Sequence, residues 1–108
     1  MSIKTQLQNT DIYIIDQILK GRFESIKSIL DVGCGSGRNL TYFLQNDFNV
    51  YGLDPNEIRL IEAQQLALKL NPSTPLSNFR FGIAEQIPFE QHFDLVICNA
   101  VFHFSNNQ

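Results

Sequence analysis

A glycine-rich turn is the first feature of the sequence that could take part in chemistry. Gly33, Gly35 and Gly37 alternate with other residues in the stretch Asp31-Val32-Gly33-Cys34-Gly35-Ser36-Gly37. Glycine has no Cβ and tolerates positive φ, so such a turn can bend sharply and bring its backbone close to a ligand. The N–H groups of a turn that leads into a helix also favour an anionic moiety. We therefore predict a ligand site here, because three glycines in so short a stretch are unusual for structure alone.

A carboxylate follows the turn at a spacing that indicates a nucleoside ligand. Asp54 lies about twenty residues beyond the glycines, the separation expected of an acid that accepts hydrogen bonds from ribose hydroxyls. Asp54 could instead only cap a helix that begins near Pro55, but its spacing from the turn favours the ribose role. Arg38 stands where a dinucleotide fingerprint has its last glycine, which disfavours a pyrophosphate-containing cofactor. An adenosine-type cofactor is the better prediction.

The elements that would position these residues alternate between strands and helices. Short apolar runs bounded by glycine or polar residues predict strands, whereas apolar residues at intervals of three and four predict amphipathic helices. In the third predicted helix, for example, Ile58, Ile61, Leu66 and Leu70 recur at helical spacing. The predicted strands cover 28–32, 49–54, 78–84 and 93–99, and the predicted helices cover 9–22, 38–46 and 56–70.

This alternation predicts an α/β fold, a three-layer Rossmann-like parallel sheet with strand order 3-2-1-4. The chain has no internal repeat or change of composition, so we expect residues 1–108 to form a single domain, with an N-terminal helix at about 9–22 and a core at about 28–104. In such sheets ligands bind in the crevice at the carboxyl ends of the strands, where the strand order reverses. The glycine turn, Asp54 and Ala84-Glu85 all fall at that predicted edge.

Composition narrows the classes of partner. The net charge is -3 over 108 residues, and no stretch concentrates Lys and Arg, so we expect no nucleic-acid partner. Cys34 and Cys98 form no CxxC pair, so we expect neither a metal site nor a disulfide framework. The sequence contains no apolar run of membrane-spanning length and starts without a signal peptide's apolar core. We therefore expect a cytoplasmic location and no membrane partner.

Four segments, in order, resemble the motifs of one known family. The resemblance is to the class I S-adenosylmethionine-dependent methyltransferases, in particular the small-molecule type (type 11/25-like), and it runs from about Ile29 to Phe104. The matching segments are ILDVGCGSG at 29–37, YGLDP at 51–55, GIAEQIPF at 82–89 and the stretch 93–104.

The resemblance implies S-adenosyl-L-methionine as cofactor and S-adenosyl-L-homocysteine as product. Asp31 and the backbone around Gly33 would hold the methionine ammonium, and Asp54 would bind the ribose hydroxyls. Pro55 would flank the adenine ring, Ala84 and Glu85 would meet its edge, and Asn99 would lie beside the sulfonium. The predicted cofactor-binding residues are therefore Asp31, Gly33, Gly35, Gly37, Asp54, Pro55, Ala84, Glu85 and Asn99.

The resemblance leaves the catalytic residue unknown, because methyl transfer from a sulfonium depends mainly on positioning and on exclusion of water. His103 is the one candidate for a base near the strand ends, although a packing role is the more common one for such a histidine. The methyl acceptor implied is a small molecule, and protein or RNA acceptors remain open.

Members of this family usually continue beyond the fourth strand, so we expect a fold truncated before strands 5–7. A fourth strand without a neighbour would expose an apolar edge, which predicts a fragment or a homo-oligomer. A non-catalytic cofactor-binding or interaction module with the same fold is therefore an alternative function. A nucleotide-dependent oxidoreductase is a second alternative, which Arg38 disfavours.

Overall fold

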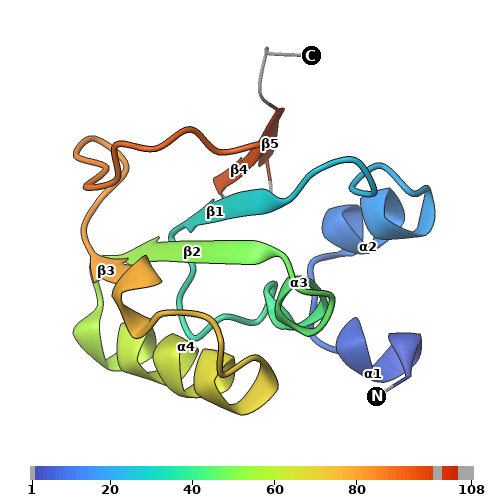
Figure 1. Ribbon diagram of the computed structural model, residues 1–108, viewed down its shortest axis with the longest axis horizontal. Coiled ribbons are helices and arrows are strands. Elements are labelled where there is room, and N and C mark those ends of the chain that lie inside the picture. Colours follow the sequence, from blue (N-terminus) through green and yellow to red (C-terminus); the bar gives the residue numbers. More distant parts are fainter. Residues whose placement is uncertain (1, 99–100, 105–108) are drawn as a thin grey trace.

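One sheet forms the centre of the protein, whose computed structural model describes residues 2–98 and the backbone of 101–104. The strand order is β3-β2-β1-β4-β5 (Figure 1). The first four strands are parallel, and β5 pairs with β4 in the antiparallel sense. The predicted order 3-2-1-4 is thus confirmed. The strands are β1 (Ser28–Val32), β2 (Asn49–Asp54), β3 (Phe79–Phe81), β4 (Leu95–Cys98) and β5 (Val101–Phe104).

The central strand β1 is apolar and β-branched because both of its faces are covered. It lies between β2 and β4, so that Leu30 is opposite both Tyr51 and Val96. Every residue of β1 after Ser28 is buried, as expected of an inner strand in a parallel sheet. The sequence boundaries of β1 and β2 agree with those in the structure.

Three of the described α-helices begin at side-chain caps, whereas the helix Thr41–Gln45 has none. Asp11 accepts a hydrogen bond from the Tyr13 backbone N–H at the start of α2, and Asn56 accepts one from the Arg59 N–H at the start of α4. No helix within the described residues has the length and apolar character needed to cross a membrane. The helices are α1 (Ile3–Gln6), α2 (Ile12–Leu19), α3 (Thr41–Gln45) and α4 (Glu57–Leu70), and a short 3-10 helix, η1, covers Leu76–Asn78.

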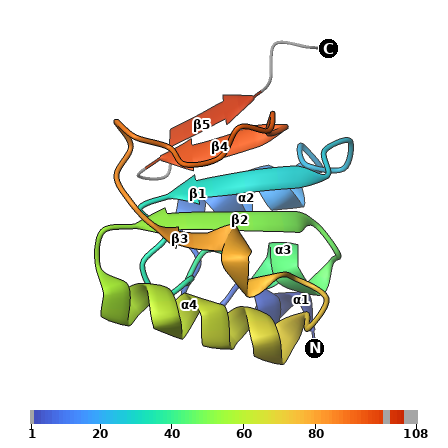
Figure 2. The ribbon, with the colours of Figure 1, turned by 60° about the vertical axis from the view of Figure 1, so that its left-hand side comes forward.

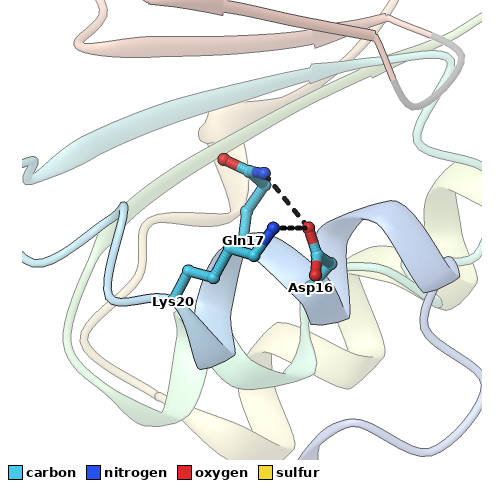
Figure 3. Close-up of polar contacts among 3 residues, drawn as sticks. All are labelled: Asp16, Gln17 and Lys20. Atoms are coloured by element: carbon cyan, nitrogen blue, oxygen red, sulfur yellow. Dashed lines mark hydrogen bonds and ion pairs between the residues drawn. The ribbon is translucent and has the colours of Figure 1, made fainter.

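Polar contacts on α2 lie on its solvent side. Lys20 Nζ is 3.1 Å from Asp16 Oδ2, and the amide of Gln17 donates to the same oxygen (Figure 3). Both charged side chains are about half exposed, so the pair stabilises the helix by only about 0.3–0.5 kcal/mol. The apolar side of α2 contributes more, since Ile14 and Ile18 are buried.

The helices and the sheet share one hydrophobic core. Residues of α2, α3 and α4 pack with Ile29 of β1, Val50 of β2 and Ile97 of β4 on the same face of the sheet. Figure 2 shows α1, α3 and α4 gathered on one side of the strands. Right-handed crossovers from β1 to β2 and from β2 to β3 place their helices on the same face.

The opposite face of the sheet is covered by a loop, residues 82–94, in place of a second helical layer among the described residues. Leu30, Leu53 and neighbouring side chains are buried there beneath an aromatic cluster. The rings of Tyr51, Phe89 and Phe93 meet edge to face, with centroids 5.0–5.9 Å apart. Of the three layers expected, the described chain thus supplies the sheet and one layer of helices.

Most of the predicted elements are shorter in the structure: the helix predicted at 9–22 covers Ile12–Leu19, and the strand predicted at 93–99 covers Leu95–Cys98. The predicted strand 78–84 pairs with β2 over Phe79–Phe81 only, because β2 ends at Asp54 and leaves the residues after Gly82 without a partner. The predicted helix 38–46 begins at Thr41, and residues 38–40 form a turn. The sequence also gave no indication of α1, which has no buried residue.

The buried face of α4 differs from the one that helical spacing indicated. Ile58 and Ile61 are 75% and 52% exposed, whereas Leu60, Ala63 and Ala67 are buried. Of the four large residues expected to face the core, Leu66 and Leu70 are partly buried and pack against it, whereas Ile58 and Ile61 do not. The small alanines are buried instead, and a Cβ at Gly37 would lie 3.6 Å from the Cβ of Ala63.

The expectation that the fourth strand ends the sheet with an exposed edge is wrong. Val101–Phe104 returns beside β4, with Cys98 opposite Val101 and Leu95 opposite Phe104. Such a hairpin supplies partners for backbone groups of β4 that would otherwise be unpaired. β5, and not β4, therefore forms this edge of the sheet.

Candidate functional site

A cavity of about 360 Å³ opens at the carboxyl end of β1, beside the glycine turn. Three of the predicted site residues, Asp31, Gly33 and Gly35, line this cavity. Carboxyl ends of parallel strands are where an α/β sheet binds its ligand, so the cavity lies where the sequence predicted a site. The remaining lining residues are Asp11, Cys34, Ser36, Arg38, Asn39 and Arg59.

The three glycines of the turn all have positive φ, as the sequence predicted, but they face different surroundings. Gly33 (φ +79°) has open space where a side chain would be, so a ligand can approach its backbone. Gly37 (φ +90°) is buried against α4, and a Cβ there would lie 3.0 Å from the Leu66 side chain. Gly33 thus leaves room for a ligand, whereas Gly37 lets the turn pack on α4.

Several amides of the turn are engaged within the protein, contrary to the expectation that they would attract an anion. The N–H groups of Gly33 and Cys34 both donate to the Leu53 carbonyl, over 2.7 and 3.0 Å. The N–H of Gly35 donates to Asp54 Oδ2. Because α3 begins only at Thr41, no helix starts directly beneath the turn. These three amides connect the turn to β2 and are unavailable to an anionic ligand.

Asp54 connects the end of β2 with the glycine turn. Its Oδ2 accepts from the Gly35 N–H and its Oδ1 accepts from the Asn56 N–H, both over 2.8 Å. The residue is 8% exposed. The carboxylate is therefore fixed in orientation at the end of β2, next to the glycine turn, by the two backbone groups that flank it.

Asp31 has a different environment. It is 3% exposed, lines the cavity, and its Oδ2 has no hydrogen-bond partner among the described residues. Burial raises the pKa of the Asp31 carboxyl from 3.8 to about 7; the Arg38 guanidinium opposes this rise, and the Asp54 carboxylate adds to it. A buried carboxylate oxygen without a partner is unfavourable, so this atom indicates a missing cationic or hydrogen-bonding ligand.

The other predicted residues lie outside the cavity or outside the described residues. Pro55, Ala84 and Glu85 are exposed in the segments that follow β2 and β3. Asn99 falls outside the described residues. The backbone of His103 pairs with Val96, two positions back from the end of β4 at Cys98, so it does not lie at the strand ends where we expected a base. Among the described residues, no three His, Cys, Asp or Glu gather as a metal site.

The N-terminal segment reaches this site, which the sequence did not indicate. The Asp11 N–H donates to Asn39 Oδ1 over 2.8 Å, and Arg38 Nη1 donates to the Asn9 carbonyl over 3.4 Å. Thr10 Oγ1 also donates to the Arg38 carbonyl, over 3.5 Å. These partners are 28 or 29 residues apart in sequence. Two features of the sequence could have indicated this contact: Asp11 stands at the start of a helix, and Arg38 directly follows the glycines.

Comparison with known proteins agrees with this fold. Residues 29–108 match the family described as "Methyltransferase domain". The match includes the glycine turn, Asp54 and all five strands, whose first four follow the order expected for the class I fold. The chain therefore belongs to the class I S-adenosylmethionine-dependent methyltransferases.

Individual relatives are similar over most of this chain. Ubiquinone biosynthesis O-methyltransferase of Rickettsia bellii is 31% identical over 97 residues, which are 88% of this chain and 39% of that protein. Magnesium protoporphyrin IX methyltransferase from Synechocystis PCC 6803, solved with bound S-adenosylmethionine, is 25% identical with a TM-score of 0.54 over 79% of this chain and 39% of its own.

A third protein shares the fold alone. The YcgJ protein of Bacillus subtilis has a TM-score of 0.58 at 20% identity, covering 82% of this chain and 38% of its own. In each case this chain spans about two-fifths of the relative's length. The residues that match the family, 29–108, include the glycine turn.

Proposed function

We propose that this chain binds S-adenosylmethionine in the cavity at the end of β1 and serves methyl transfer to a small-molecule acceptor. The observation that carries this proposal is the buried Asp31 Oδ2, which lines the cavity without a partner. An ammonium group is the complement of such an oxygen, because a cation both neutralises the charge and donates hydrogen bonds.

The residues at the ends of β1 and β2 match the amino-acid and ribose parts of the cofactor. Asp31 would accept from the methionine ammonium, and the open space at Gly33 would let the chain pass close to the turn. Each carboxylate oxygen of Asp54 accepts one backbone hydrogen bond and retains capacity for another. Asp54 can therefore accept from both ribose hydroxyls without losing its structural bonds. Ala84 and Glu85, both exposed, would lie along the adenine.

The chemistry asks the protein mainly for positioning. S-adenosylmethionine, when bound, supplies a methyl group on a sulfonium that is already activated for transfer. Asp31 and Asp54 would hold the two ends of the donor and so fix the direction from which an acceptor must approach. No general base is required for this role.

The net charge of the chain and the name of its Rickettsia relative both favour a small molecule as the methyl acceptor. The net charge of -3 provides no cationic surface for a nucleic acid. The Rickettsia relative is, by name, an O-methyltransferase of ubiquinone biosynthesis. We therefore expect an acceptor oxygen on a small organic molecule.

Calorimetric titration of the chain with S-adenosylmethionine, S-adenosylhomocysteine and NAD tests the donor site. We expect the first two to bind and NAD to bind at least about tenfold more weakly, because Arg38 occupies the fingerprint's glycine position. Asp54→Asn should weaken S-adenosylhomocysteine by about tenfold, since an amide loses one charged acceptor. Tighter binding of NAD would overturn the donor assignment.

The role in transfer has its own test. Donor labelled with tritium on the methyl group is mixed with the chain and a panel of phenols, and label in the phenol is counted. Label transfer that Asp31→Asn abolishes would support an enzyme. Donor binding with no transfer to any phenol would overturn methyl transfer by this chain to the expected acceptor class.

A further inference from the structure

The outer side of α4 presents an apolar stripe to solvent. Ile58, Ile61 and Leu68 are each more than half exposed. Together with Gln65, they recur at alternating intervals of three and four residues, which places them in one line along the helix. Figure 2 shows α4 at the outside of the molecule, with the sheet on one side of it. The helix thus has two apolar sides, one packed on the sheet and one facing solvent.

Further exposed apolar residues lie beside this stripe, at the edge of the sheet. Gln64 borders the stripe, and its Nε2 donates to the carbonyls of Leu76 and Phe79, over 3.1 and 3.3 Å. Leu76 is 45% exposed, and Phe81, which points to the same face of β3 as Phe79, is 60% exposed. A gathering of exposed apolar side chains, unlike a single one, indicates an interaction surface.

The charges beside the stripe favour one kind of partner. Glu57 and Glu62 flank its N-terminal half, Lys69 flanks its C-terminal end, and all three are exposed. A lipid surface is disfavoured, because helices that bind membranes carry an excess of Lys and Arg on their polar side. A helix with acids towards one end and a base at the other is instead complementary to an antiparallel copy of itself.

One register of an antiparallel pair opposes the stripe along its whole length. When Ile58 of one copy meets Leu68 of the second, Ile61 meets Gln65, and the two-fold axis repeats both contacts. Gln65 is the one polar residue of the stripe. A single polar residue in an otherwise apolar helix contact favours one register over the alternatives.

The same register pairs the flanking charges. In an antiparallel pair each flank of a helix meets the same flank of its partner, so Glu62 of one copy lies beside Lys69 of the second. The two-fold axis forms this pair twice. A parallel pair would instead bring Glu57 of one copy beside Glu62 of the second, a like-charge contact. The charges therefore select the antiparallel arrangement.

We propose that this chain forms a two-fold symmetric dimer through antiparallel pairing of its α4 helices along this stripe. One pair of helices is a small interface, so we expect a weak dimer, with a dissociation constant of about 1–100 μM. The inference is independent of the proposed function, because Arg59, the residue of α4 that lines the cavity, is not part of the stripe.

The first test removes the apolar contact. We expect Leu68→Glu to raise the dissociation constant of the dimer at least about 100-fold, because a carboxylate would be buried against Ile58 and near Glu57 of the second copy. Leu19→Glu is the matched control, since Leu19 is a leucine of α2 that is 69% exposed, and it should leave the constant unchanged. Sedimentation velocity over a range of chain concentrations measures dimerisation, after circular dichroism has confirmed folding.

The second test reverses the charges and so examines the register. Glu62→Lys and Lys69→Glu should each raise the dissociation constant about tenfold, because either change creates two like-charge contacts in the symmetric dimer. The double variant with both substitutions restores opposite charges and should return to within about threefold of the wild type. All of these differences should shrink at about 1 M salt.

Three results would overturn the dimer. They are a wild-type chain that sediments as a monomer at every concentration up to about 1 mM, equal losses for Leu68→Glu and Leu19→Glu, and single charge reversals that the double variant does not rescue. A monomeric wild-type chain that cosediments with phosphatidylcholine vesicles, and does so less after Leu68→Glu, would assign the stripe to a lipid surface instead.

Discussion

Asp31 and Asp54 end neighbouring parallel strands, yet the protein surrounds the two carboxylates differently. Asp54 accepts hydrogen bonds from two backbone N–H groups, whereas Asp31 is nearly inaccessible and one of its oxygens has no partner. Hydrogen bonds to backbone N–H groups stabilise the fold, whereas burial without a partner disfavours the charge of a carboxylate. Asp54 therefore contributes to folding, while the charge on Asp31 opposes it.

We predict that Asp31→Asn stabilises the free protein while weakening donor binding. The folded-state pKa of Asp31 is about 7, above its ordinary 3.8, so its contribution to stability is fully present below pH 4 and is lost as the pH rises to 7. The variant's gain in free energy of unfolding should therefore grow between pH 4 and 7 to at most about 4 kcal/mol and then stay constant. Urea unfolding across this range measures it.

An exposed acid provides the control for Asp31. Asp16→Asn removes a half-exposed carboxylate paired with Lys20, so its free energy of unfolding should change by less than about 0.5 kcal/mol. Calorimetry should find S-adenosylhomocysteine bound at least about tenfold more weakly by Asp31→Asn at pH 8. A variant that is less stable than the wild type at pH 8 would contradict the unfavourable charge.

The glycine turn and Asp54 could be predicted from sequence, because only one helix and one strand separate them along the chain. The positive φ of the glycines and the position of Asp54 beside the turn follow from that local order. Asp11 and Arg59 could not be predicted, because they reach the cavity through the packing of α2 and α4. The inward amides were missed because their acceptor, Leu53, lies on the neighbouring strand.

At the scale of elements, inner strands were predictable and the outer ones were not. The boundaries of β1 and β2 coincide with their apolar runs because pairing on both sides selects such residues. The edge strand β3 has one partner, so its length depends on where β2 ends. In α4, close packing at Gly37 selects small residues for the buried face, a constraint that apolar spacing alone does not contain.

The cap of α4 should matter more than the cap of α1. Asn56 caps a helix of 14 residues that buries Leu60, Ala63 and Ala67. We expect Asn56→Ala to lower the free energy of unfolding by about 1 kcal/mol, because the Arg59 N–H loses its acceptor. Thermal or urea unfolding followed by circular dichroism measures this loss.

Ser2→Ala is the matched control for that cap. Ser2 also accepts from a backbone N–H, that of Thr5, but α1 has four residues and none is buried. Fraying of α1 should therefore leave global unfolding unchanged within about 0.3 kcal/mol. If Ser2→Ala and Asn56→Ala lowered the free energy of unfolding equally, the cost of losing a cap would not depend on how deeply the helix is buried.

At the scale of the whole molecule, one side chain connects the start of the central strand to the start of β4. Asp94 Oδ2 accepts from the backbone N–H groups of Lys27 and Ser28, over 2.8 and 3.1 Å. The Asp94 N–H in turn donates to Ser28 Oγ over 2.9 Å. The partners are 66 or 67 residues apart, so this clamp closes the loop that contains every helix after α2.

Asp94→Ala should destabilise the protein at neutral pH. The Lys27 and Ser28 N–H groups lower the pKa of the Asp94 carboxyl, so its contribution is present above about pH 4 and is lost as the pH falls through the lowered pKa. We expect a loss of about 1–3 kcal/mol at pH 7 from the missing charged hydrogen bonds. The difference from the wild type should shrink below pH 4.

Glu90→Ala is the charge-matched control, since Glu90 is an exposed acid of the same 82–94 loop. Its unfolding free energy should change by no more than about 0.5 kcal/mol. Urea unfolding at pH 7 and pH 4 compares the two variants. An Asp94→Ala loss that is independent of pH would mean that the carboxylate's charge plays no part in the clamp.

The two hydrogen bonds of Asp54 also bear on how related chains would diverge. A descendant that lost methyl transfer would remain under selection to fold, and folding alone would preserve a carboxylate that fastens the glycine turn and Asn56 to β2. Asp31 has no such protection, because its buried charge opposes folding. Given the donor-binding role proposed for Asp31, an acid retained at position 31 would therefore mark related chains still selected for donor binding more reliably than an acid at position 54.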